Sequence, residues 1–130
     1  MKNTIDEILK LKTWAIVGLS TNQDLPAYEI AALLQEKGHR IVPVHPKGET
    51  VHGEPGYKSL ADIPFAVDVV DVFVNSSLAG DVIDEAIAIG AKAVWLQLFV
   101  LDAAGIERAE KAGLLAVMNK CPAIEYGKRS

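Results

Sequence analysis

The chain has 130 residues, half of them hydrophobic, and a formal net charge of -4. This length is typical of one domain with a packed core, so we expect a single domain over residues 1–130. The acidic balance argues against a nucleic-acid partner, because phosphate backbones are bound by basic surfaces. A single cysteine excludes an internal disulfide and favours the cytoplasm. No apolar run approaches the ~20 residues that a membrane span requires, so no membrane partner is expected.

The first predicted element is a short helix over residues 3–11, with Asn3 or Thr4 as its N-cap. An apolar run then predicts a buried strand over 13–18, which Gly18 ends. A helix over 26–37 follows. Pro26 suits its first position, where the missing N–H costs nothing.

Four strands, two helices, a long loop and a C-terminal tail complete the chain. Apolar runs predict strands over 40–45, 68–74, 93–97 and 114–118. Pro43 lies inside the second strand and favours an edge position for it. Helices are predicted from a Ser76 or Ser77 cap to Gly90 and from an Asp102 cap to Lys111. Residues 46–64 form a long loop, and residues 119–130 a C-terminal tail.

Strands that alternate with helices predict an α/β protein with a parallel sheet covered on both faces. We expect a Rossmann-like three-layer sandwich with five strands in the order 3-2-1-4-5. The ligand crevice of such a sheet lies where the winding direction reverses, here between strands one and four. Its lining comes from the loops after the strands. These loops include Val74, Asn75 and Ser76 after strand three and Gln97 after strand four.

The loop after the first strand carries small polar groups beside a helix N-terminus. It begins Gly18, Leu19, Ser20, Thr21, Asn22. Backbone N–H groups and the helix dipole favour an anion there, most often a phosphate. The loop lacks both the Gly-x-Gly-x-x-Gly pattern and a Walker sequence. A phosphate-binding loop and an ordinary polar turn therefore both remain open.

The second strand ends in His45, Pro46 and Lys47. Enzymes that use a nicotinamide dinucleotide usually place Asp or Glu here, to hold a ribose hydroxyl. The sequence therefore disfavours a standard NAD dehydrogenase. Lys47 is a candidate partner for a phosphate, or else a solvated surface lysine.

Groups for catalysis are few. The three histidines lack metal-ligand spacing, so no metal site is predicted. Cys121 would need a nearby base to act as a nucleophile, and only His45 is a candidate; the alternative is a small packing residue. Asp68 and Asp71 lie in the third strand. They suit either acid–base chemistry or hydrogen bonding to neighbouring backbone.

The motifs together resemble the small stand-alone CoA-binding proteins, over roughly residues 10–127. The matching segments are Ala15-Ile-Val-Gly-Leu-Ser20, Val42-Pro-Val-His-Pro46, Tyr57-Lys-Ser-Leu-Ala-Asp-Ile-Pro64, Val67-Asp-Val-Val-Asp-Val-Phe73, Glu85-Ala-Ile87, Gly90-Ala-Lys-Ala-Val-Trp-Leu-Gln97, Ala112-Gly-Leu114 and Val117-Met-Asn-Lys-Cys121 with Glu125-Tyr126. The resemblance implies the Rossmann-like fold of the CoA-binding domain of succinyl-CoA synthetase. It also implies that 18–22 face the diphosphate of coenzyme A, while 45–47 and 74–76 border its adenosine and pantetheine.

The chain departs from that family at four positions. Leu25 and Val74 stand where arginines are common, His45 replaces an asparagine, and Phe99 lies near a usual small glycine. Two guanidinium partners for phosphate are thus missing, and Phe99 is expected to fill part of the crevice.

The sequence predicts a protein that binds CoA or an acyl-CoA without catalytic activity of its own. The alternatives are an accessory subunit of a CoA-dependent transferase or ligase and a ligand-free protein-interaction domain. A homodimer is plausible, since small domains commonly form one.

Overall fold

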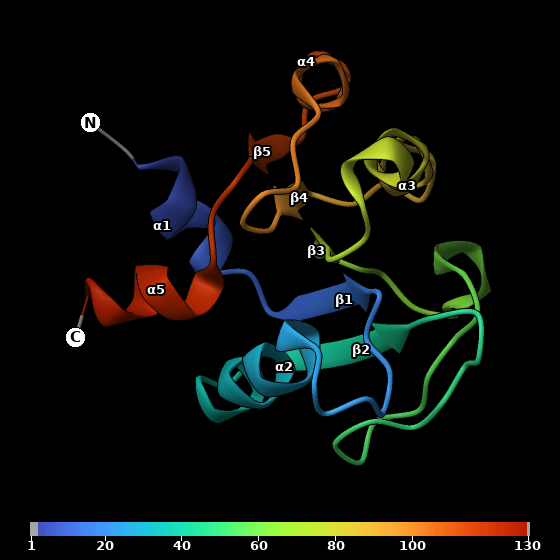
Figure 1. Cartoon of the computed structure of the whole chain (residues 1–130). Coiled ribbons are helices and arrows are strands. Elements are labelled where there is room, and N and C mark those ends of the chain that lie inside the picture. Colours follow the sequence, from blue (N-terminus) through green and yellow to red (C-terminus); the bar gives the residue numbers. More distant parts are fainter. Residues whose placement is uncertain (1–2, 130) are drawn as a thin grey trace.

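The computed structural model describes residues 3–129, which form a five-stranded parallel sheet with helices on both faces (Figure 1). The strands are β1 (Thr13–Val17), β2 (Arg40–Val44), β3 (Val69–Val72), β4 (Ala93–Leu96) and β5 (Leu115–Val117). The helices are α1 (Thr4–Leu9), α2 (Pro26–Glu36), α3 (Ser76–Ala88), α4 (Ala103–Lys111) and α5 (Pro122–Gly127), with a 3-10 turn at Leu60–Asp62. This confirms the predicted α/β Rossmann-like class.

The sheet has the order β2-β1-β3-β4-β5. The 3-2-1-4-5 winding pattern is kept only if the chain at Tyr57, which forms a single parallel bridge with Val44, is counted outside β2. The strand predicted over 68–74 does not take that outer place. As β3 it lies beside β1, with Ala15 opposite Val70. The switch point therefore falls between β1 and β3, and not between the first and fourth strands of the sequence.

Pro43 explains why the chain at Tyr57 forms only one bridge with β2 and not a sixth strand. Tyr57 donates its N–H to the Pro43 carbonyl at 2.9 Å and accepts from the His45 N–H at 3.0 Å. Within a strand, the N–H and C=O of one residue point to the same side, so the missing N–H of Pro43 removes the next donor on this edge. β2 is thus the edge strand that its proline predicted.

Each face of the sheet is packed against its own set of helices. Helices α3 and α4 cover one face, while α1, α2 and α5 cover the other (Figure 1). The first core contains Val70, Val94 and Ile83; the second contains Trp14, Ile16 and Trp95. Because both faces are buried, the strands are mostly apolar, and Asp71 of β3 is a buried exception.

The helix ends follow ordinary capping chemistry, with two differences from the sequence expectation. Asp102 caps α4, as predicted, by accepting from the Gly105 N–H at 3.1 Å. The cap of α3 is Asn75, not Ser76 or Ser77, and it accepts from the Ser77 N–H at 2.8 Å. The segment predicted as a tail contains helix α5, whose first position is Pro122. None of the helices within residues 3–129 combines the length and the apolar character that a membrane span requires.

Candidate functional site

A cavity of about 370 Å³ opens at the carboxyl ends of β1 and β2, beside α3. Its lining consists of Val17, Gly18, Val44, His45, Pro46, Lys58, Ser59, Leu60, Val74, Leu78, Asp81, Val82 and Glu85. This is the position at which sheets of this kind bind ligands, next to the switch point.

Gly18 forms the inner wall of the cavity and has a conformation that favours glycine. Its φ is 105°, and its N–H donates to the Val44 carbonyl at 2.8 Å. A Cβ here would lie 3.2 Å from the Cβ of Phe73, a tight contact. Glycine therefore lets the chain turn away from β1 while staying in close contact with the segment after β3.

The rest of the first loop uses its polar groups internally. Leu19 is buried in the core beneath α2, so its side chain does not reach the cavity. The Ser20 hydroxyl accepts from the Asn22 N–H at 3.2 Å, and the Asn22 carboxamide accepts from the Asp24 N–H at 3.0 Å. Thr21 contacts Glu49 of the long loop. Of the five predicted residues of this loop, only Gly18 lines the cavity.

The end of β2 and the segment bridged to it bring His45 and Lys58 to the cavity. His45 and Pro46 line it as predicted, whereas Lys47 is exposed and lies outside the lining. The Lys47 N–H donates to His45 Nδ1 at 3.1 Å, which places the proton of a neutral imidazole on Nε2. Lys58 joins the lining because the Tyr57 bridge carries it to this edge. Lys58 belongs to the segment from Tyr57 to Pro64 that the family resemblance includes, but the sequence does not show that this segment lies beside β2.

The segments after β3 and β4 contribute less than expected. Val74 lines the cavity, while Asn75 is occupied as the cap of α3. The Ser76 hydroxyl accepts from the Leu101 N–H at 2.9 Å and donates to the Phe99 carbonyl at 3.3 Å. Gln97 is buried, and its Oε1 has no hydrogen-bond partner among the described residues.

Phe99 does not fill the crevice, contrary to the sequence expectation. Its side chain is 84% exposed, and its φ of 66° turns the chain outward. The Asn119 carboxamide accepts from the Phe99 N–H at 2.8 Å and holds this conformation. The crevice is open because these contacts direct the phenyl ring into solvent.

The electrostatics of the cavity are mixed. Lys58 and His45 lie on the β2 side, while Asp81 and Glu85 project from α3. Leu78, Asp81 and Glu85 were missed by the sequence analysis. Their regular spacing in α3 marks one helix face, but nothing in the sequence says that this face borders a cavity.

The candidate catalytic residues lie apart. Cys121 is buried at the start of α5 and is absent from the cavity lining, whereas His45 is part of it. Asp68 accepts from the Thr13 N–H at 3.0 Å and pairs with Lys92 at 3.4 Å, which is a structural role. Residues 3–129 contain no group of three or more His, Cys, Asp or Glu placed to hold a metal ion.

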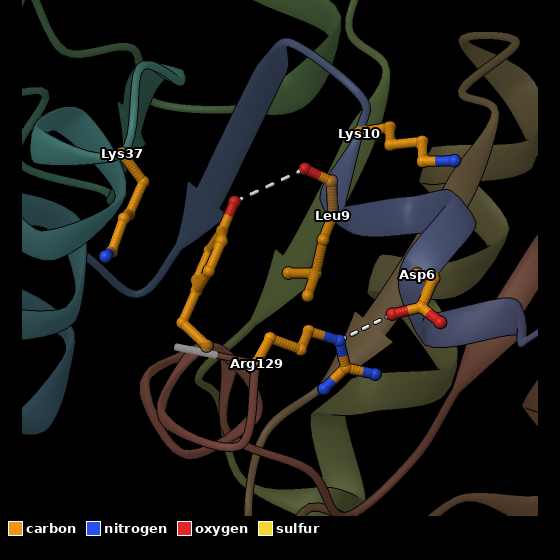
Figure 2. A pocket seen from close by; sticks show the side chains of 6 residues that line it. Asp6, Leu9, Lys10, Lys37 and Arg129 are labelled. Carbon is orange, nitrogen blue, oxygen red and sulfur yellow. Dashed lines mark hydrogen bonds and ion pairs between the residues drawn. The ribbon is translucent and has the colours of Figure 1, made fainter.

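A larger cavity, about 470 Å³, lies between α1, the end of α2 and α5 (Figure 2). Lys10 and Lys37 follow the ends of α1 and α2, where cations complement the helix dipoles. Arg129 pairs with Asp6 (Figure 2), and the Tyr126 hydroxyl oxygen lies 3.3 Å from the Leu9 carbonyl oxygen. These groups join the helices α1, α2 and α5, so the smaller cavity at the switch point is the better ligand site.

The sheet order and the cavity at its switch point define a Rossmann-like α/β domain with a candidate ligand site. Residues 12–127 match the model of the CoA binding domain family, and the chain belongs to that family. The resemblance seen in the sequence is thereby confirmed.

Relatives of similar length share most of the chain. The YneT protein of Bacillus subtilis (strain 168) is 29% identical over 121 residues, which cover 92% of this chain and 90% of the relative. A hypothetical protein from Pyrococcus horikoshii OT3 is 38% identical, with a TM-score of 0.90 over 95% of this chain and 88% of that one. A third likeness shows the fold alone: acetyl-coenzyme A synthetase 1 of Ca. Korarchaeum cryptofilum is 21% identical, with a TM-score of 0.74, over 87% of this chain and 27% of its own.

Proposed function

We propose that this protein binds coenzyme A or an acyl-CoA in the cavity at the carboxyl edge, in the cytoplasm, and does not itself carry out a reaction. The observation that supports this most is the cavity at the switch point, with Gly18 on one side and Lys58 on the other. Membership of the CoA binding domain family supports the choice of ligand.

The parts of coenzyme A suit different walls of the cavity. Its diphosphate suits the part of the cavity next to the first loop, which Gly18 lines without a side chain. The additional phosphate on its ribose suits Lys58 and the exposed Lys47. Its pantetheine arm suits the apolar side chains of Val74 and Leu78. The other predicted residues would act mainly by holding the lining of the cavity in place. They are Leu19 to Asn22, Asn75, Ser76 and Gln97.

A thermal-shift screen with CoA, acetyl-CoA, succinyl-CoA, ADP, NAD and NADP tests the proposal. A ligand at ~100 times its dissociation constant stabilises the folded state by about 2.7 kcal/mol, which raises the melting temperature by several degrees. We expect a shift with CoA and its thioesters. No shift with any CoA species at millimolar concentration contradicts the proposal.

A pair of lysine variants locates the site. Lys58→Gln removes a cation of the cavity, and Lys111→Gln removes one from α4, where it pairs with Glu107. We expect weaker CoA binding only for Lys58→Gln. Equal affinity in both variants would place the ligand elsewhere.

A role as accessory subunit is the second candidate. A domain of this fold makes up about a quarter of the acetyl-coenzyme A synthetase chain. This supports a function in which the present protein works beside a separate catalytic chain. A co-purified partner and an acyl-CoA-dependent activity that neither protein shows alone would favour this function.

A further inference from the structure

Glu49, in the long loop after β2, lies against the first loop. Its carboxylate accepts from the Thr21 hydroxyl at 3.3 Å to each oxygen and from the Thr21 N–H at 3.5 Å. These are the kinds of donor that a phosphate-binding loop offers its ligand. The Glu49 carboxylate therefore already accepts the hydrogen bonds that Thr21 could donate to a diphosphate at the first loop.

We propose that Glu49 is a specificity-determining residue that weakens phosphate binding at the first loop and so makes affinity depend on the cations at the β2 end. This inference rests on the proposed function. To bind a diphosphate, the loop must either give up the Thr21–Glu49 contact or hold two like charges side by side.

The position of Glu49 is built into the fold. Val51, two residues on, is 2% exposed in the core beneath α2. His52 Nε2 donates to the Tyr28 carbonyl at 2.7 Å, and the Gln35 carboxamide donates to the His52 carbonyl at 3.1 Å. Both contacts fix the long loop to α2.

Gly56 packs directly against the backbone of Glu49. A Cβ on Gly56 would lie 2.0 Å from the Glu49 carbonyl oxygen, closer than real atoms approach. The two segments can touch only because residue 56 is glycine. Packing against α2 and against Gly56 thus fixes the backbone of the long loop. This backbone position holds the Glu49 carboxylate next to Thr21.

No cation of the first loop offsets this charge. Residues 18–26 contain no Lys or Arg, and they add a second carboxylate, Asp24. Two unit charges about 4 Å apart change an affinity roughly fivefold even when they are fully solvated. A diphosphate here meets net repulsion, which the lysines at the β2 end must offset.

Glu49→Gln tests the role of the charge. The amide keeps an oxygen that accepts from Thr21, so the loop contact is retained while the charge is lost. We expect calorimetric titrations to show tighter binding of both CoA and ADP, by about 5- to 30-fold. Adenosine, which has no phosphate, should bind both proteins equally. The gain should shrink at high salt, because screening reduces charge repulsion.

Glu54→Gln is the matched control, because it removes the same charge from the same loop and Glu54 makes no side-chain contact with Thr21. Equal gains from both variants, or no gain from Glu49→Gln while the wild type binds CoA, would overturn the inference. If neither the wild type nor Glu49→Gln binds CoA or ADP at all, the proposed function itself fails, and this inference fails with it.

Discussion

Asp71 is a carboxylic acid without a partner in the middle of the sheet. It is fully buried, and its register places it between Ile16 and Trp95. Neither carboxyl oxygen has a hydrogen-bond partner among the described residues. Burial raises the pKa of Asp71 well above its usual value. The side chain is therefore held as the neutral acid, which costs less than a buried charge.

The first prediction concerns this residue and pH. In the unfolded chain Asp71 loses its proton above its ordinary pKa of 3.8, whereas in the folded protein it keeps that proton to a higher pH. Its contribution to stability is therefore lost as pH rises from that value towards the folded pKa. Asp71→Asn removes this loss. Its stability relative to wild type should rise between about pH 4 and pH 7 in urea unfolding. Parallel pH profiles for the two proteins would contradict the prediction.

His39 has the opposite pH behaviour. Its Nδ1–H donates to the Leu11 carbonyl at 2.8 Å, and its Nε2 accepts from the Tyr126 hydroxyl at 2.5 Å. Burial, helped by nearby Lys12, lowers the pKa of His39 below 6.5, despite hydrogen bonds that act the other way. The folded protein thus holds this imidazole neutral where the unfolded chain protonates it.

The second prediction follows from that pKa. Stability should fall as pH drops through 6.5, because the unfolded chain then binds a proton that the folded one resists, and level off below the folded pKa. An NMR titration of the His39 ring should give a midpoint below 6.5. His39→Gln should lower stability at neutral pH and flatten this part of the pH profile. A midpoint at or above the ordinary value would contradict it.

Among the secondary-structure elements, α5 depends most on a few contacts. It packs against α2 and carries Tyr126, whose hydroxyl contacts both His39 Nε2 and the Leu9 carbonyl. One side chain thereby joins α5 to α1 and to the start of β2.

The third prediction tests this junction. Tyr126→Phe keeps the ring but removes the hydroxyl and leaves His39 Nε2 without a donor. We expect a loss of about 1–3 kcal/mol in the free energy of unfolding. Tyr28→Phe is the control, because the structure shows no hydroxyl contact for Tyr28 among residues 3–129. Equal effects of the two substitutions would show that the junction contributes nothing.

At the scale of the whole molecule, the two ends of the described chain are joined. Arg129, just after α5, forms ion pairs with Asp6 of α1 and with Glu125 of α5. The fourth prediction compares two changes at this end. Arg129→Ala should lower the stability only slightly, because the pair with Asp6 is partly exposed and Lys128 still pairs with Glu125. Deletion of residues 122–130 should cost several times more, because it uncovers Trp14, His39 and the core around them. Thermal unfolding of both variants measures the difference. Similar losses would contradict the claim that packing of α5 outweighs its ion pairs.

Much of this architecture could be predicted because its causes are local. Apolar runs, Pro26 and Gly38 mark β1 and α2, and Asp102 marks the start of α4. Helix α5 was missed because its six residues are stabilised by contacts with α1 and α2 rather than by a pattern of their own. The place of β3 was missed because it depends on how the chain at Tyr57 pairs across the edge of β2.

The candidate site was predictable only as a location. The sheet pattern placed it at the carboxyl ends of the strands, and Gly18, His45, Pro46 and Val74 do line the cavity. Lys58 and the face of α3 could not be predicted, since their approach follows from tertiary packing. Phe99 was misplaced because its direction depends on a positive φ held by Asn119, twenty residues away.

The two borders of the sheet restrict how copies of this protein can associate. β2 lacks a donor at Pro43 and is capped at its carboxyl end by the Tyr57 bridge, while β5 has only three residues. Short or proline-containing borders are poor templates for another strand. A continuous intermolecular sheet is therefore disfavoured, and the protein gains protection from the edge-to-edge growth that leads to fibrils. Away from these borders, the exposed apolar side chains include Leu98, Phe99 and Leu101.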